Sequence, residues 1–301
     1  MAFKVRDTGE IAAPTSGGTW DITISGFGTP NAIIVDCVGA ITSGTARAPC
    51  AGSVGFSVAS NQYCFSWVSD DNNTTSDTSS TPLNNSVVAI YSSVGTIDFR
   101  ASFNSFITDG VRLTINTSPS QAWICNVTLM TLPNVQAITG SSPNTQDASN
   151  SIGVLFEPEL LILASCFSSS INNIERTDAR VGFGASTFTK QRSINWFDKD
   201  GVTTTSAASI ASSDRTLIAV DDSGSTPTAL ECLNPAATSF DAFTRDAAGG
   251  IVFAGLAINF NSEAVFDIGH GSSQTSTGSE TVSTGTVAPE YVRVAISISD
   301  A

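Results

Sequence analysis

Several kinds of residue are scarce in this sequence of 301 residues, and each scarcity argues against a class of protein. The one histidine, His270, stands between two glycines in a turn-like segment, so no imidazole is placed to act as base in a Ser-His-Asp relay. Lys and Arg total 13 against 27 Asp and Glu, a formal net charge of -14. Such a chain repels phosphate backbones and anionic lipid heads. We therefore expect no nucleic acid partner and no membrane insertion.

Long hydrophobic runs are also missing. No stretch approaches the roughly 20 apolar residues of a membrane helix. The first residues contain no continuous apolar segment of the kind that a signal peptide needs, so we expect synthesis in a cytoplasm. The six cysteines form no CxxC pair and no zinc-like spacing, and several stand in apolar runs, which predicts buried free thiols.

The patterning of the chain predicts strands. Hydrophobic residues make up 41% and charged residues 13%, which is too apolar for a disordered chain and too weakly charged for a helical surface. Short apolar runs occur at residues 32–35, 160–163 and 251–253, and residues 292–298 alternate. Glycine-containing turns separate them at short intervals, as expected for antiparallel hairpins. We find no amphipathic helix longer than about three turns.

The sequence repeats itself at a spacing of about 130 residues, which is the size of one domain. Pro30 precedes one apolar run and Pro158 precedes the next. Trp67 and Trp196 are each followed by acidic residues.

Two further segments extend this correspondence. Residues 54–56 correspond to residues 181–183, and residues 101–106 correspond to residues 238–243 with extra loop residues before the second copy. The repeats predict one architecture used twice.

We therefore predict an all-β chain of two tandem antiparallel β-sandwich domains, jelly-roll-like and derived from an internal duplication. The first unit is expected at residues 1–139 and the second at residues 140–301. The second includes the C-terminal strands of a partial third repeat at residues 272–301. Because a lone strand leaves its edge groups unpaired, these strands should close the second sandwich or pair with another subunit.

Acidic residues that follow the two repeated tryptophans are candidate metal ligands, as listed here: Asp70, Asp71, Asp198 and Asp200. Closely spaced carboxylates in a glycine-containing loop suit a structural Ca²⁺ ion. The loops lack a bidentate glutamate at the expected spacing, and hairpin-turn chemistry explains both clusters without a metal. No other cofactor is expected.

The tryptophans themselves allow two interpretations. Trp67 and Trp196 could contact a sugar ligand, but their recurrence at matching places favours core packing. A glycosidase would need two carboxylates at a defined separation, and a chain with 27 acidic residues offers such pairs by chance. We expect no enzymatic activity.

Short motifs in the first half resemble modules of tail-fibre-like virion proteins of tailed bacteriophages. They are Gly26-Phe27, Pro30, Ser102-Phe103, Asp109-Gly110 and Ala122-Trp123. In that family such modules are β-sandwich building blocks, so the resemblance implies a structural role on a phage particle.

The resemblance and the repeats together lead to a functional expectation. We expect a non-enzymatic structural protein on the surface of a tailed-phage virion, assembled in the host cytoplasm, as a tail fibre, a spike or a capsid decoration protein. Its partners would be other virion proteins and copies of itself, through symmetric interfaces, with host surface glycan as a further partner in host attachment. The alternative is a carbohydrate-binding, lectin-like module that recognises a receptor.

Overall fold

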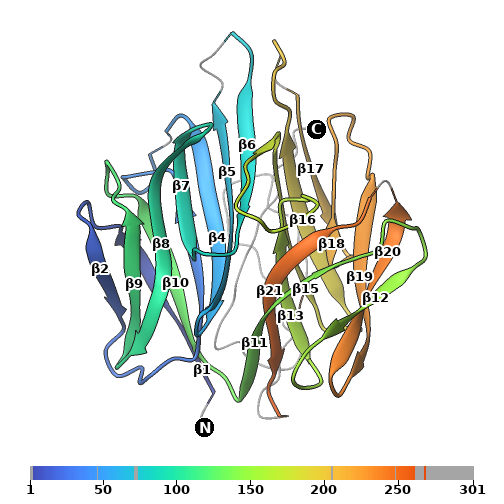
Figure 1. Ribbon diagram of the computed structural model, residues 1–301, viewed down its shortest axis with the longest axis horizontal. Coiled ribbons are helices and arrows are strands. Elements are labelled where there is room, and N and C mark those ends of the chain that lie inside the picture. The colour runs from blue at the N-terminus through green and yellow to red at the C-terminus, as the bar shows by residue number, and fades with distance from the viewer. Residues whose placement is uncertain are drawn as a thin grey trace, which may run out of the picture.

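The computed structural model describes residues 3–45, 47–70, 74–204, 206–247, 249–261 and 268, and the regular elements of this part are all strands (Figure 1). Every strand pair is antiparallel, and the strands form four sheets. The predicted all-β class with antiparallel β-sandwiches is confirmed. The described residues contain no helix long and apolar enough to cross a membrane.

The first ten strands form the part of the molecule called unit 1 below. They are β1 (Lys4–Ala12), β2 (Gly18–Thr23), β3 (Ala32–Val38), β4 (Cys50–Val58), β5 (Asn61–Asp70), β6 (Asp77–Leu83), β7 (Val88–Ser93), β8 (Thr96–Ile107), β9 (Gly110–Thr117) and β10 (Ile124–Thr131). Inner sheet 1 has the order β1-β10-β3-β4-β5-β6-β14, its last strand coming from later in the chain, and outer sheet 1 has the order β2-β9-β8-β7.

The remaining strands belong to unit 2. They are β11 (Asn134–Ser141), β12 (Ser149–Gly153), β13 (Leu160–Ser165), β14 (Arg176–Thr177), β15 (Ala179–Ser186), β16 (Gln191–Asp198), β17 (Ala207–Ser212), β18 (Leu217–Ile218), β19 (Thr228–Ala236), β20 (Ser239–Ala247) and β21 (Val252–Asn259). Inner sheet 2 has the order β11-β21-β13-β15-β16-β17, and outer sheet 2 has the order β12-β20-β19-β18.

The two units have the same strand order once β14 is set aside. In each, the first two strands pair with the last two, as in a jelly roll, and the strands between them form meanders. The internal duplication itself stays a prediction. A duplication would produce two units with the same strand order, as found here. The predicted strands of a partial third repeat at residues 272–301 lie outside the described residues.

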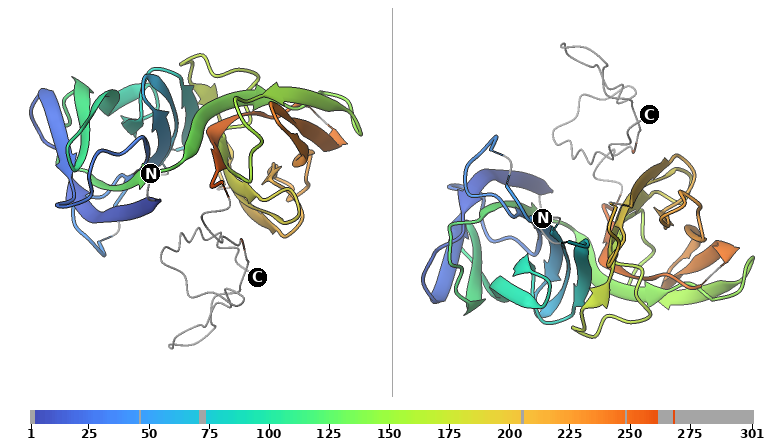
Figure 2. Two further views of the ribbon diagram at one scale, coloured as in Figure 1. Left: turned by 90° about the horizontal axis from the view of Figure 1, so that it is seen from below. Right: turned by 90° about the horizontal axis from the view of Figure 1, so that it is seen from above.

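The four sheets form a stack of layers (Figure 2), and the three large hydrophobic cores lie between them. One core lies between outer sheet 1 and inner sheet 1, and another between inner sheet 2 and outer sheet 2. The third lies between the two inner sheets, so units 1 and 2 pack back to back. The central strands of each inner sheet are therefore buried on both faces.

Burial on both faces explains why the central strands carry continuous apolar runs. In β3, Ile33 and Val35 enter the core inside unit 1, whereas Ala32 and Ile34 enter the core shared with unit 2. A strand with one wet face would alternate, but here the four successive side chains of residues 32–35 are all buried.

The structure corrects parts of the predicted correspondence. The predicted boundary at residue 139 lies inside β11, which pairs with β21, so the change from unit 1 to unit 2 comes between β10 and β11. A Cβ added to Gly55 would meet the carbonyl oxygen of Val87, and one added to Gly184 would meet that of Thr216. Gly184, not Gly182, is therefore the partner of Gly55.

The second predicted alignment is also wrong. Residues 101–106 lie in β8, whereas residues 239–243 lie in β20, which has the place of β9 in the strand order. The alignment failed because a short Ser-Phe motif can occur in either of two neighbouring strands, so the motif does not identify the strand. The spacing of about 130 residues holds along the whole unit without the extra loop residues.

Candidate functional site at the junction of the two units

The end of the β5–β6 hairpin in unit 1 is bonded to the β16–β17 turn of unit 2. The backbone N–H of Ser76 donates to the carbonyl of Val202 at 2.8 Å, and the N–H of Gly201 donates to the carbonyl of Ser76 at 2.9 Å. The Ser76 hydroxyl donates to the carbonyl of Lys199 at 2.7 Å and accepts the N–H of Val202 at 3.2 Å. One serine thus makes four bonds across the junction.

The predicted acidic residues meet at this junction. Asp198 is 2% exposed and accepts a hydrogen bond from the hydroxyl of Ser69. Asp200 accepts the backbone N–H of Thr78 at 3.0 Å. Asp70 stands opposite Asp77 in the β5–β6 register. The acidic turns of the two units are thus brought together.

These contacts use the carboxylates of Asp198 and Asp200 as hydrogen-bond acceptors between units. Asp71 lies outside the described residues, and within them no group of three or more His, Cys, Asp or Glu is arranged to hold a metal ion. The calcium site stays a prediction.

The junction has a negative electrostatic character. Burial, followed by the nearby charges of Asp200, Asp70 and Glu175, raises the pKa of the Asp77 carboxyl. A group whose charged form is disfavoured in this way prefers protonation, so the contact between units should strengthen on mild acidification.

A strap from unit 2 strengthens the same junction. Between β13 and β15 the chain crosses to unit 1, where β14 pairs with β6. Asn84 and Asn173 exchange two hydrogen bonds, with the Asn84 N–H and the Asn173 side-chain amide donating at 2.8 Å each. Glu175 accepts the N–H of Gly95 at 3.0 Å. The strap covers the edge that β6 would otherwise expose.

The two tryptophans lie on inner-sheet strands and are both half-buried. The Trp67 ring contacts the edge of Phe183 from unit 2, with centroids 6.0 Å apart, and lies against Gly52. Trp196 stands between Val181 of β15 and Ser209 of β17 in the register. Trp67 therefore takes part in packing between units, and its role as a ligand contact stays a prediction, as does that of Trp196.

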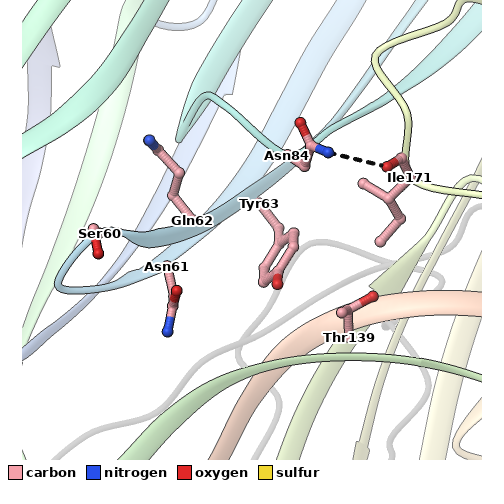
Figure 3. A pocket seen from close by; sticks show the side chains of 7 residues that line it. All are labelled: Ser60, Asn61, Gln62, Tyr63, Asn84, Thr139 and Ile171. Atoms are coloured by element: carbon pink, nitrogen blue, oxygen red, sulfur yellow. Dashed lines mark hydrogen bonds between the residues drawn. The ribbon is translucent and has the colours of Figure 1, made fainter.

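A pocket of about 450 Å³ opens at the junction of the units (Figure 3). Its lining comes from four separate parts of the chain and consists of Ser60, Asn61, Gln62, Tyr63, Asn84, Thr139 and Ile171. Most of these side chains carry amides or hydroxyls, and none is charged. Donors and acceptors of this kind, beside one aromatic ring, can bind the hydroxyl groups of a sugar.

Sequence reasoning missed this pocket. Asn84 donates to the carbonyl of Ile171 at 3.3 Å, and Gln62 accepts the backbone N–H of Phe103 at 2.8 Å, so long-range contacts hold two of the lining side chains. The only local signal is the polar turn at residues 60–62 between two apolar strands. Nothing in that turn indicates that Thr139 and Ile171 complete the lining of the pocket.

The fold defines an all-β protein of two antiparallel sandwiches packed back to back. No protein-family model matches the chain, and no curated protein matches it in sequence. Two solved structures from Sulfolobus Turreted Icosahedral Virus are similar to it, one titled as an atomic structure of the virus and one as its major capsid protein. They are each 13% identical, with TM-scores of 0.23 and 0.22. The alignments cover 87% and 88% of this chain and 93% and 100% of theirs.

These structures come from an archaeal virus, whereas the sequence motifs resemble tail-fibre-like proteins of tailed bacteriophages. Similarity at this level does not assign a function to the chain.

Proposed function

We propose that the protein is a non-enzymatic structural component of a virion surface and that it works through protein–protein contacts. In finer terms, it would be a tail fibre, a spike or a capsid decoration protein of a tailed phage, as the sequence motifs suggest. Its partners would be other virion proteins and further copies of the chain, related by symmetry.

The observation that carries this proposal is the way the two units are fixed to each other. They share a hydrophobic core between their inner sheets, and β14 of unit 2 completes a sheet of unit 1. Hydrogen bonds from Ser76 and Thr78 add a polar contact at the end of that core. Independent domains linked by a flexible tether would lack all three features. A rigid block of four sheets suits a protein that keeps a fixed shape in an assembly.

The charge supports the same proposal. With a net charge of -14, the exterior keeps the protein soluble at high local density and repels DNA and anionic lipid. A particle surface crowded with copies of one protein has that requirement.

An antibody raised against the purified protein tests the proposal. Phage lysates would be separated by density gradient, and the fractions compared for infectivity and for antibody signal. We expect the protein to travel with infectious particles and gold-labelled antibody to mark their surface in electron micrographs. Antibody signal confined to the soluble fractions, with unlabelled particles, would refute a virion role.

A carbohydrate-binding function is the second candidate, and the pocket in Figure 3 is the observation that favours it. Titration with polysaccharide from the host surface would test it. Asn61→Ala and Tyr63→Phe should weaken binding, because each removes polar atoms from the pocket. Thr19→Ala is the matched control, since Thr19 is an exposed polar residue on β2, the edge strand of outer sheet 1, and does not line the pocket. Equal binding by all three variants and the wild type would exclude this pocket as the site.

A further inference from the structure

Two cysteines of unit 1 face each other across neighbouring strands. Cys37 of β3 and Cys125 of β10 are direct partners in the antiparallel register, and their Sγ atoms are 2.7 Å apart. Directly opposed residues of antiparallel strands have Cα separations of about 4.5–5.5 Å, which falls within the span of a disulfide. The spacing of the two strands is therefore compatible with a bond between these two sulfur atoms.

The surroundings of the pair favour a covalent bond. Both side chains lie in the core between inner sheet 1 and outer sheet 1, at 2% and 1% exposed. The Cys125 thiol donates to the Cys37 sulfur at 2.7 Å, so no other group lies between the two sulfur atoms that a disulfide of about 2.05 Å would join.

Unit 2 has no such pair. In β13 and β21 of unit 2, the residues that correspond to Cys37 and Cys125 are Ser165 and Phe253. They are the next residues after Ala164 and before Ala254, which are partners in the register. The Ser165 hydroxyl donates to the carbonyl of Val252 at 2.6 Å instead. The facing cysteines are therefore a property of unit 1 and not of the shared architecture.

We propose that Cys37 and Cys125 form a reversible disulfide that fastens β3 to β10 when the protein passes from reducing to oxidising surroundings. The change from reducing to oxidising surroundings rests on the proposed function, because a virion released from a cytoplasm undergoes it. The oxidant is a small-molecule disulfide such as oxidised glutathione.

The exchange has two steps. One cysteine thiolate attacks the glutathione disulfide and releases the first glutathione thiolate, which takes up the proton that the cysteine lost. The second cysteine thiolate then attacks the protein sulfur of the mixed disulfide and releases the second glutathione in the same way. The two protein thiols are oxidised, and one glutathione disulfide is reduced to two thiols.

Burial controls the rate of this reaction. Burial, together with the contact to Cys125, raises the pKa of the Cys37 thiol well above its ordinary value, so the reactive thiolate is scarce in the folded protein. Oxidation should therefore be slow in the native state and faster in low concentrations of urea, which increase local opening. The bond closes a loop of 88 residues, which should lower the unfolding equilibrium constant on the order of 10³-fold.

Thiol mapping tests the proposal on the full chain. Cys50 is exposed, so Cys50→Ser is used as the background to prevent disulfides between molecules. The reduced protein is equilibrated with oxidised glutathione in low urea, quenched with acid, unfolded, alkylated and digested for mass spectrometry. We expect a linked peptide that contains Cys37 and Cys125, with Cys64 and Cys232 alkylated. Equal alkylation of Cys37, Cys125 and Cys64 would overturn the proposal.

Stability measurements provide a second test that does not depend on one variant folding well. Oxidation should raise the urea midpoint of the Cys50→Ser protein, and a dithiol reductant should reverse the shift. The shift should vanish in a Cys125→Ser variant and persist in the matched variant Cys64→Ser. A reversible shift of the same size in the Cys125→Ser variant would contradict the proposal.

The two proposals can fail separately. Absence of the linked peptide after the purified protein has been equilibrated with oxidised glutathione rejects the disulfide, whatever the particle contains. Presence of that peptide in a protein that never travels with particles keeps the disulfide and rejects the virion role.

Discussion

Gly55 and Gly184 each lie where backbone from the other side of the sandwich comes very close to an inner-sheet strand, and replacing them tests the architecture directly. Gly55 of β4 lies under β7, and a Cβ built on it would be 1.8 Å from the carbonyl oxygen of Val87. In unit 2, a Cβ on Gly184 would be 1.5 Å from the carbonyl oxygen of Thr216. The atoms that would clash belong to the backbone, so no side-chain rotation can relieve the contact.

The expected destabilisation follows from these distances. Ordinary van der Waals contact begins at 3.4 Å, so each alanine would push its two sheets apart by more than about 1.5 Å. Overpacking a well-filled core typically costs 1–3 kcal/mol, and a clash with rigid backbone belongs at or above the upper end. We expect Gly55→Ala and Gly184→Ala each to lower the free energy of unfolding by about 3 kcal/mol or more.

Urea unfolding followed by tryptophan fluorescence measures this effect. Gly153→Ala is the matched control, because Gly153 lies in a strand and a Cβ there would meet nothing within 4 Å. That variant should stay within about 0.5 kcal/mol of wild type. If Gly55→Ala or Gly184→Ala unfolded at the same urea concentration as the control, the close approach of the sheets would be refuted. If only one of the two variants lost much stability, the structural equivalence of Gly55 and Gly184 would be refuted.

Three further predictions concern the junction of the units. Ser76→Ala removes a hydroxyl that bonds to Lys199 and Val202, so it should lower the free energy of unfolding by about 1–2 kcal/mol, whereas the exposed Ser16→Ala should change it by less than about 0.5 kcal/mol. Equal values in urea titrations would count against the polar contact. Asp77→Asn should raise the melting temperature at pH 7. Because the pKa of Asp77 is raised in the folded state, the wild type should gain stability as the pH falls through that pKa toward 3.8, and the advantage of the variant should shrink. A constant advantage in calorimetry from pH 7 to pH 4 would contradict the raised pKa of Asp77. Trp67→Ala should lower stability by about 2 kcal/mol, since the partly buried ring packs against Phe183 and Gly52, and should leave any binding of host glycan unchanged. Loss of glycan binding without loss of stability would show that Trp67 contacts the ligand and is not needed for packing.

The strands themselves could be predicted because their signals are local. The run at residues 32–35 became β3, and the run at residues 160–163 became most of β13. The turn signal Asp109-Gly110 lies where β8 turns into β9, with Asp109 between the two strands and Gly110 at the start of β9. Asp109 has a φ of 64°, a conformation that aspartate tolerates better than most residues.

The register between the two units was harder to predict. A shift of two residues keeps every side chain on the same face of a strand, so Gly182 and Gly184 are equivalent as far as alternation is concerned. Only the carbonyl of Thr216, which approaches Gly184 from another sheet, distinguishes them. That contact is made by residues far apart in the chain.

The acidic residues illustrate the same limit at the candidate site. The sequence placed Asp70 and Asp198 in equivalent turns, and it could not show that the two turns lie at one junction. There, Ser69 donates to Asp198 across a separation of 129 positions in the chain. The residue pattern of one strand does not indicate which strand of the other unit will lie against that strand.

By itself, the sequence determined an all-β chain, its turns and the repetition of one strand plan, because hydrophobic spacing and turn residues act over a few positions. The tertiary structure decided that the inner sheets pack back to back, that a strap completes the neighbouring sheet, and that Cys37 meets Cys125. Each of these depends on which surfaces exclude water together. That choice is made by the whole folded chain and not by any segment of it.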